Sequence, residues 1–93
     1  MTVDEQFVTV VTGFNATAFE REYRRACTSG FLASKIFVLL YFDRKEWTTG
    51  EMAKELDNHR SNVHVSLRGL ERSGLVRRVS RLTWCYRIYT KMV

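Results

Sequence analysis

The chain has 93 residues, which is enough for one domain with a single hydrophobic core and too few for two. Apolar residues make up 45% of it, but the longest apolar run, from Ile36 to Phe42, is far shorter than the roughly 20 residues of a membrane span. The N-terminus lacks the basic-then-apolar order of a secretory signal. We therefore expect a cytoplasmic, intracellular protein that does not enter a membrane.

The net charge of +5 is distributed unevenly along the chain. Residues 1–58 hold seven Lys or Arg against nine Asp or Glu, a net charge of −2. Residues 59–93 hold eight Lys or Arg against one acid, Glu71, a net charge of +7. Such a division predicts a polyanion-binding surface at one end of the molecule. The alternative interpretation is a solvated basic face without a partner.

Residues that could carry chemistry are few. Cys27 and Cys85 cannot form a dense disulfide framework, and we expect two reduced, buried thiols. The only two histidines, His59 and His64, are five residues apart and would not share one helical face, so we expect no metal site and no cofactor. A Gly-rich phosphate loop is absent, and the carboxylates have no neighbouring His or Cys, so we do not expect an enzyme.

The N-terminal third of the chain predicts a strand or an arm, followed by a helix. Residues 3–12 are rich in β-branched side chains, which favour a strand or an ordered arm, although a helix is not excluded. Asn15 can cap a helix that starts at Ala16 and carries apolar residues at helical spacing. Thr28-Ser29-Gly30 then predicts its end.

A second, more apolar helix is predicted from Phe31 to Phe42. We expect its buried stripe to comprise Leu32, Ile36, Leu39 and Leu40. Further apolar residues flank the stripe, so this helix should be covered on more than one side.

The next segment predicts two short helices joined by a tight turn. Thr48-Thr49-Gly50-Glu51 fits a capping box, in which Thr48 and Glu51 exchange hydrogen bonds with each other's amides. After the polar turn at residues 57–59, a helix should run from about Arg60 to Ser73. Gly74 is placed to end that helix in the left-handed conformation. Its buried stripe would be Val63, Leu67 and Leu70.

A β-hairpin is predicted at the end of the chain. The β-rich runs 75–79 and 84–90 are separated by residues 80–83, which form a turn. We expect Trp84 and Tyr86 to pack on the core, and Trp47 to close the core beside the Thr48 cap. Base stacking by these aromatic residues is a weaker interpretation.

These elements predict a mainly α protein with a small β-hairpin (α+β), arranged as a winged helix-turn-helix. We read residues 1–93 as one domain. It comprises an N-terminal arm and helix for dimerisation (1–30), a core helix and first motif helix (31–58), a recognition helix (59–74) and a wing hairpin (75–90).

The segment from Thr48 to Tyr86 resembles the MarR and ArsR superfamily of winged-helix regulators. The resemblance lies in Thr-Thr-Gly-Glu-Met-Ala-Lys-Glu-Leu (48–56), in Ser-Asn-Val (61–63), in Leu-Glu-Arg-Ser-Gly-Leu-Val-Arg-Arg (70–78) and in Tyr-Arg-Ile (86–88). It implies DNA binding and transcription regulation. Asn58 stands where the family usually has an aliphatic residue, and the Asp-x-Arg of MarR-like wings and the paired cysteines of metal-sensing ArsR proteins are absent.

An outward helix face rich in Arg, with further Arg on the wing, suits the major groove and adjacent phosphates of double-stranded DNA. The predicted DNA-binding residues are Thr49, His59, Arg60, Ser61, Asn62, His64, Val65, Arg68, Arg72, Arg78, Ser80, Arg81 and Thr83.

Partners are predicted from the same features. We expect a sequence-specific regulator acting as a homodimer, because a chain this short leaves apolar surface that a partner could bury. The predicted dimer interface comprises Val3, Phe7, Val11, Phe19 and Tyr23. The alternatives are an accessory subunit that docks onto a protein of the transcription or replication machinery, and a sequence-independent DNA binder.

Overall fold

The computed structural model describes residues 15–89. The first two helices in this range have the bounds that the sequence predicts. Helix α2 spans Ala16–Cys27 and helix α3 spans Phe31–Phe42. Asn15 caps α2, since its Oδ1 accepts a hydrogen bond of 3.0 Å from the amide of Ala18. The strand or arm predicted at residues 3–12 lies outside the described residues.

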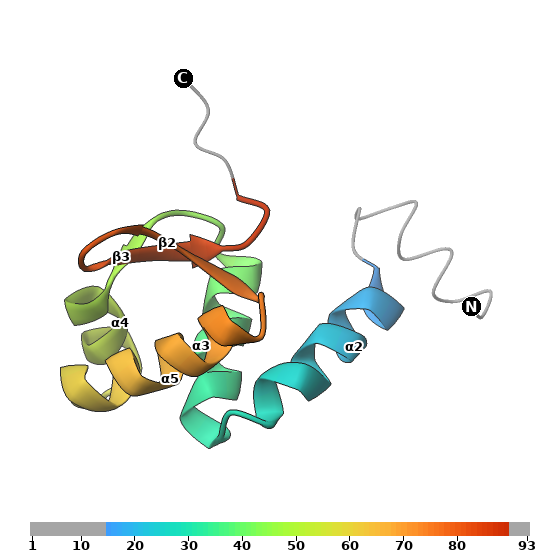
Figure 1. Cartoon of the computed structure of the whole chain (residues 1–93), viewed down its shortest axis with the longest axis horizontal. Coiled ribbons are helices and arrows are strands. Elements are labelled where there is room, and N and C mark those ends of the chain that lie inside the picture. The colour runs from blue at the N-terminus through green and yellow to red at the C-terminus, as the bar shows by residue number, and fades with distance from the viewer. Residues whose placement is uncertain (1–14, 90–93) are drawn as a thin grey trace.

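Helix α3 forms the centre of the core and packs against α2, α5 (Arg60–Arg72) and strand β3 (Thr83–Tyr86) (Figure 1). Its buried side differs from the predicted stripe, because Leu32 and Leu39 are half-buried while Phe37 and Tyr41 are buried. The reason is aromatic packing. The ring of Phe19 lies 5.8 Å from that of Phe37 and 4.9 Å from that of Tyr41, which draws this side of α3 inward.

Helix α4 (Thr49–Glu55) begins with the predicted capping box. The amide of Glu51 donates to Thr48 Oγ1 over 3.0 Å, and the amide of Thr48 donates to Glu51 Oε1 over 2.9 Å. These two bonds satisfy amides that the first turn of a helix otherwise leaves unpaired. They hold the pKa of the Glu51 carboxyl below its ordinary value, chiefly through the bond from the Thr48 amide.

Helix α5 has the predicted stripe, because Val63, Leu67 and Leu70 are fully buried. Gly74, with φ of 73°, ends the helix as predicted. The amide of Gly74 donates to Glu71 O and the amide of Leu75 donates to Leu70 O, which is the Schellman pattern of a helix C-terminus.

The sheet has three antiparallel strands within the described residues, in the order β1-β3-β2. Strand β2 spans Val76–Ser80, and its hairpin partner β3 ends at Tyr86 rather than near Thr90. Strand β1, Trp47–Thr48, was not predicted, because two residues are too few to show an alternating pattern. Trp47 pairs with Trp84 and both indoles are buried, which confirms their predicted core positions.

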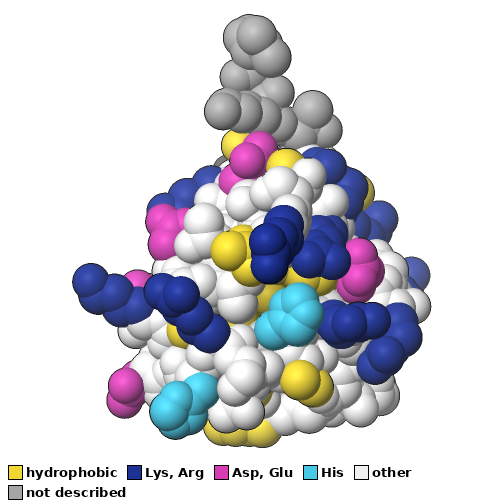
Figure 2. Space-filling view, turned by 60° about the vertical axis from the view of Figure 1, so that its left-hand side comes forward, with side chains coloured by type: hydrophobic (Ala, Val, Ile, Leu, Met, Phe, Trp, Pro, Cys, Tyr) yellow, Lys and Arg dark blue, Asp and Glu magenta, His cyan; other side chains and the backbone are white. Residues whose placement is uncertain are grey.

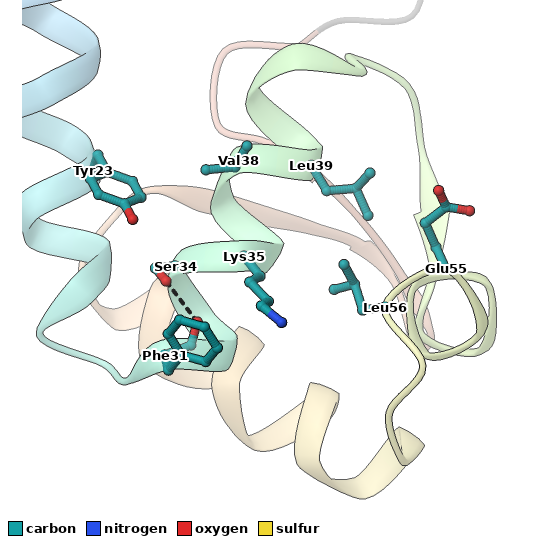
Figure 3. Close-up of a pocket in the computed structure, with 8 residues that line it drawn as sticks. All are labelled: Tyr23, Phe31, Ser34, Lys35, Val38, Leu39, Glu55 and Leu56. Carbon is teal, nitrogen blue, oxygen red and sulfur yellow. Dashed lines mark hydrogen bonds between the residues drawn. The ribbon is translucent and has the colours of Figure 1, made fainter.

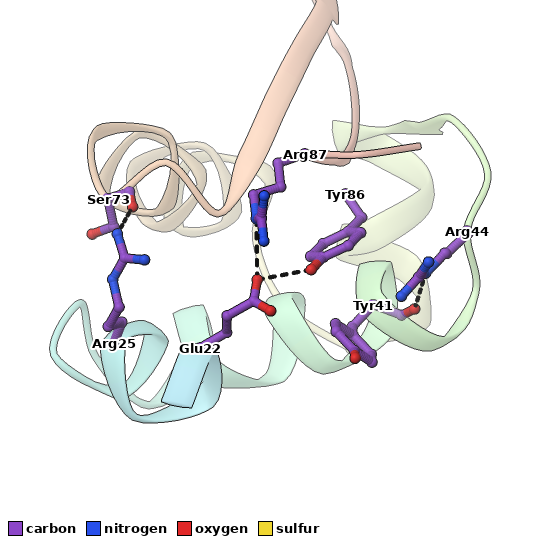
Figure 4. Close-up of polar contacts among 7 residues, drawn as sticks. All are labelled: Glu22, Arg25, Tyr41, Arg44, Ser73, Tyr86 and Arg87. Carbon is purple, nitrogen blue, oxygen red and sulfur yellow. Dashed lines mark hydrogen bonds and ion pairs between the residues drawn. The ribbon is translucent and has the colours of Figure 1, made fainter. Parts of the chain in front are cut away.

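A buried carboxylate joins α2 to the sheet (Figure 4). Glu22 is 9% exposed, and its Oε1 accepts from the hydroxyl of Tyr86 over 2.8 Å and from Nε of Arg87 over 3.2 Å. Burial and the neighbouring carboxylate raise the pKa of Tyr86 to about 12, so its hydroxyl remains a donor. Arg25 adds a hydrogen bond to the carbonyl of Ser73 at the end of α5.

The two cysteines have different environments, and both are free thiols. Cys85 is buried as expected, and burial raises the pKa of its thiol. Cys27 is exposed at the end of α2, so the expectation of a buried thiol there is wrong. None of the helices between residues 15 and 89 is long and apolar enough to cross a membrane.

Gly69 allows α5 to pass close to the turn between α2 and α3. A Cβ atom at position 69 would lie 3.1 Å from Ser29 Oγ and 3.2 Å from Ser29 Cβ. Alanine in a helix is otherwise favoured over glycine by about 1 kcal/mol. In a Ser29→Gly background, we expect Gly69→Ala to raise the free energy of unfolding by that amount. In the wild-type chain, the same substitution should raise the free energy of unfolding by less, or lower it. A double-mutant cycle by urea denaturation measures the difference, and additive effects would contradict the contact.

The capping box also predicts how stability depends on pH. Because the Glu51 pKa is lowered in the folded chain, its contribution is complete above the ordinary pKa of 4.5 and is lost as the pH falls through the folded value. We expect Glu51→Gln to flatten the fall in free energy of unfolding on acidification below that pH. Glu71→Gln, which alters an exposed carboxylate of α5, is the matched control. Equal acid profiles for the Glu51→Gln variant and the wild type would rule out this role.

Candidate nucleic-acid interface

The outward side of α5 forms an exposed surface beside α4 and the hairpin (Figure 1). Ser61, Val65, Arg68 and Arg72 follow one another at helical spacing on it, and all four are exposed. Figure 2 shows Lys and Arg side chains around a histidine on the end of the molecule where α4 and the hairpin turn lie. The predicted face of α5 is therefore accessible along most of its length.

The hairpin turn is tied to the start of α4. The carbonyl oxygen of Leu82 accepts from the amide of Thr49 over 2.9 Å and from Thr49 Oγ1 over 3.3 Å. Thr49 is 4% exposed, so its prediction as a DNA contact is wrong. Its side chain instead fixes the turn of the hairpin relative to the helix pair.

The side chain of Arg78 also stabilises the hairpin. Its guanidinium donates to the carbonyl of Ser80 over 3.3 Å and to the carbonyl of Arg81 over 2.5 Å. The same group lies 5.3 Å from the centre of the Trp84 ring. These bonds satisfy the carbonyls of the turn. The side chain remains exposed, so the predicted DNA contact of Arg78 stays a prediction.

Arg81 lies in the turn itself and is exposed, as are Ser80 and Leu82. Thr83, the first residue of β3, is half-buried and pairs with Thr48 of β1. No hydrogen bond or ion pair engages the guanidinium of Arg81 within residues 15–89, and the same holds for Arg68 and Arg72. These three cations therefore point to solvent with their donors unused.

The first two turns of α5 pack against neighbouring elements. The ring of His64 lies 6.3 Å from that of Trp84 and is half-buried, so His64 packs against the hairpin as well as facing outward. Trp84 Nε1 is the one buried side-chain polar atom without a hydrogen-bond partner among the described residues. The guanidinium of Arg60 lies against Gly50 of α4, where a Cβ atom would come within 3.1 Å of Nη2.

Asn58 organises the turn between α4 and α5. Its Oδ1 accepts from the amide of His59 over 2.9 Å and from Nδ2 of Asn62 over 3.0 Å. His59 and Asn62 are exposed, but the side-chain amide of Asn62 already donates one hydrogen bond to Asn58. This role was not predicted, although Asn side chains commonly form hydrogen bonds to the backbone in turns.

The structure describes two of the five residues of the predicted dimer interface, Phe19 and Tyr23. Val3, Phe7 and Val11 lie outside the described residues. Phe19 is half-buried and packs inside its own chain, against the rings of Tyr23, Phe37, Tyr41 and Phe42, so only part of its side chain is accessible. Tyr23 is half-buried and lines a surface hollow between α2, α3 and α4.

Comparison with family models, with characterised proteins and with solved structures found no match to this chain. In the part of the chain from residue 15 to residue 89, no three His, Cys, Asp or Glu side chains are grouped so that they could hold a metal ion. The candidate interface therefore rests on its own geometry and charge.

The tie between α4 and the hairpin can be tested through Thr49→Val, which keeps the shape of the side chain and removes its hydroxyl. We expect the free energy of unfolding to fall by about 0.5–1.5 kcal/mol, the typical worth of one hydrogen bond. Faster amide exchange in the turn at residues 80–82 should accompany the loss. Thr83→Val is the matched control, since its hydroxyl makes no hydrogen bond within residues 15–89. Equal losses in both variants would count against the tie.

Proposed function

We propose that residues 48–89 form a winged helix-turn-helix that binds double-stranded DNA, with α5 in the major groove and the β2–β3 hairpin as the wing. Helices α4 and α5 are joined by four residues, and the hairpin follows α5 directly. An α-helix fits the major groove, and residues at the start and along one face of the second helix can contact base edges. The earlier resemblance to MarR and ArsR regulators supports this proposal.

The observation that carries the proposal is the placement of the unused guanidiniums. Arg68 and Arg72 are four residues apart on the exposed side of α5, and Arg81 stands at the turn of a hairpin whose position Thr49 fixes. The span 59–89 holds a single acid, Glu71. Phosphates and guanine edges are the partners that such arginines recognise with two parallel hydrogen bonds.

Sequence-specific recognition is the second part of the proposal. Ser61 and Val65 are exposed between the arginines of α5, and they offer a hydroxyl for base edges and an apolar surface for a thymine methyl. A helix that carried phosphate contacts alone would not need such side chains. We therefore propose an intracellular transcription regulator that binds a two-fold symmetric site as a homodimer.

A second candidate function is docking onto a protein of the transcription or replication machinery. The observation that favours it is apolar exposure at the same elements: Val65 is 69% exposed and Leu82 is 55% exposed. A protein partner would cover such side chains at the centre of an interface. The surrounding arginines favour DNA over this alternative.

Arg68→Ala and Arg81→Ala test the two proposed contacts separately. We expect Arg68→Ala to cost about 1–3 kcal/mol of binding free energy and to relax the preferred sequence at one position. Arg81→Ala should weaken binding to all sequences and reduce the slope of log affinity against log salt by about 1. Arg21→Ala on α2 removes the same charge elsewhere and is the control. Fluorescence anisotropy with labelled duplexes measures all three, and unchanged affinities for Arg68→Ala and Arg81→Ala would refute the assignment.

Selection from random duplex DNA, followed by binding at two salt concentrations, separates the candidate functions. An enriched motif supports the regulator. Binding without a motif, falling with salt equally for every duplex, supports a sequence-independent DNA binder. No enrichment together with weak binding at low salt supports the protein-docking function and overturns the proposal.

A further inference from the structure

A largely apolar hollow of about 340 Å³ opens on the surface between α2, α3 and α4 (Figure 3). Tyr23 of α2, Val38 and Leu39 of α3, and Leu56 after α4 supply most of its wall. All four side chains are half-buried. None of the lining residues comes from α5, β2 or β3. Phe31, at the rim, also lines a second hollow with Asn62 and Val65 of α5, so the two surfaces adjoin there.

The hollow exists because α3 is apolar around most of its circumference. A helix of this kind is normally covered on all sides. In this chain α2, α5 and β3 cover one side, and the side that carries Val38 and Leu39 remains partly open. The described elements of the chain thus leave an unfilled apolar surface.

A protruding aromatic residue stands at the rim of the same hollow. Phe31, the first residue of α3, is 78% exposed, the highest value among the large exposed hydrophobic residues between 15 and 89. Figure 3 shows its ring beside the hollow, on the side away from Leu56. A projection and a cavity on one face are the two halves of a self-complementary contact.

The rim also carries one charge of each sign. Lys35 of α3 and Glu55 of α4 both line the hollow, and neither forms an ion pair within residues 15–89. The ammonium of Lys35 lies 4.7 Å from the centre of the Phe31 ring. In a two-fold arrangement, the positive rim of each copy can face the negative rim of the other.

We propose that this hollow binds a second copy of the chain in an isologous dimer. The Phe31 side chain of each copy enters the hollow of the other, beside Val38 and Leu39. Lys35 of each copy pairs with Glu55 of the other. The inference deepens the proposed function, because it assigns the surface that forms the dimer.

The first test measures self-association by analytical ultracentrifugation, over a wide range of concentrations and without DNA, so that its result does not depend on DNA binding. The wild type should dimerise, and Phe31→Ala should weaken the dimer about tenfold to a hundredfold, as expected for one buried aromatic side chain. Ile88→Ala, which truncates an apolar residue that is 55% exposed outside the hollow, is the matched control. Because Phe31 is exposed in the monomer, its truncation should leave the fold intact, and circular dichroism checks this.

The second test uses charge reversal to show that the two rims meet across the interface. Lys35→Glu places two acids opposite each other in its homodimer, and Glu55→Lys places two lysines there. Each variant alone should dimerise at least tenfold more weakly than the wild type. A mixture of the two should form a heterodimer, because both rim contacts then regain opposite charges.

Three outcomes overturn the inference. A wild-type chain that is monomeric at every concentration excludes the second copy and leaves the hollow to residues 1–14 of the same chain or to another protein. A dimer that tolerates Phe31→Ala and both charge reversals is formed elsewhere. A mixture of the reversed variants that does not associate rejects the Lys35–Glu55 pairing. DNA binding by a chain that fails these tests would leave the proposed function standing with a different dimer or with a monomer.

Discussion

Burial of α3 is the constraint on which the rest of the structure depends. Ile36, Phe37 and Leu40 are fully enclosed, and the elements that enclose them are the ones that carry the candidate interface or hold it in place. Helix α5 packs its Val63, Leu67 and Leu70 stripe inward, which turns Arg68 and Arg72 outward. Burying apolar surface is worth about 25 cal/mol per Å², so this packing outweighs any preference of the individual surface residues. The exposed face of α5 is a consequence of what its other side must cover.

Polar contacts then set the positions that apolar packing leaves undetermined. Non-directional burial could place the hairpin at several angles, but the bonds from Thr49 to the Leu82 carbonyl select one of them. Glu22 acts in the same way at the opposite end of β3, where it receives bonds from Tyr86 and Arg87. Both contacts join residues more than 30 positions apart, so they link α2 and α4 to the hairpin.

Elements with strong local signals could be predicted from the sequence, and contacts between distant residues could not. The Thr48 and Glu51 capping box, the inward stripe of α5 and the Gly74 cap are each encoded within a few residues, and the structure has all three. Strand β1 exists because Trp47 meets Trp84 across the sheet, and the burial of Thr49 follows from its bond to Leu82. No periodicity within a short window indicates such pairings, which is why Thr49 was assigned to the interface. The open flank of α3 was missed for a related reason, since pattern alone cannot distinguish a helix covered on all sides from one that is covered on most.

The arginine count of the C-terminal half overstates the charge that is free to meet a polyanion. Residues 59–89 contain seven arginines, but Arg77 is bonded to the Tyr89 carbonyl, Arg78 to the hairpin turn and Arg87 to Glu22. Four remain, and of these Arg60 lies against Gly50 of α4. Release of counterions from a nucleic acid follows the number of phosphates neutralised rather than the net charge of the protein. Many of the arginines in this half thus stabilise the fold itself, because their guanidinium groups donate hydrogen bonds to carbonyls and to a buried carboxylate.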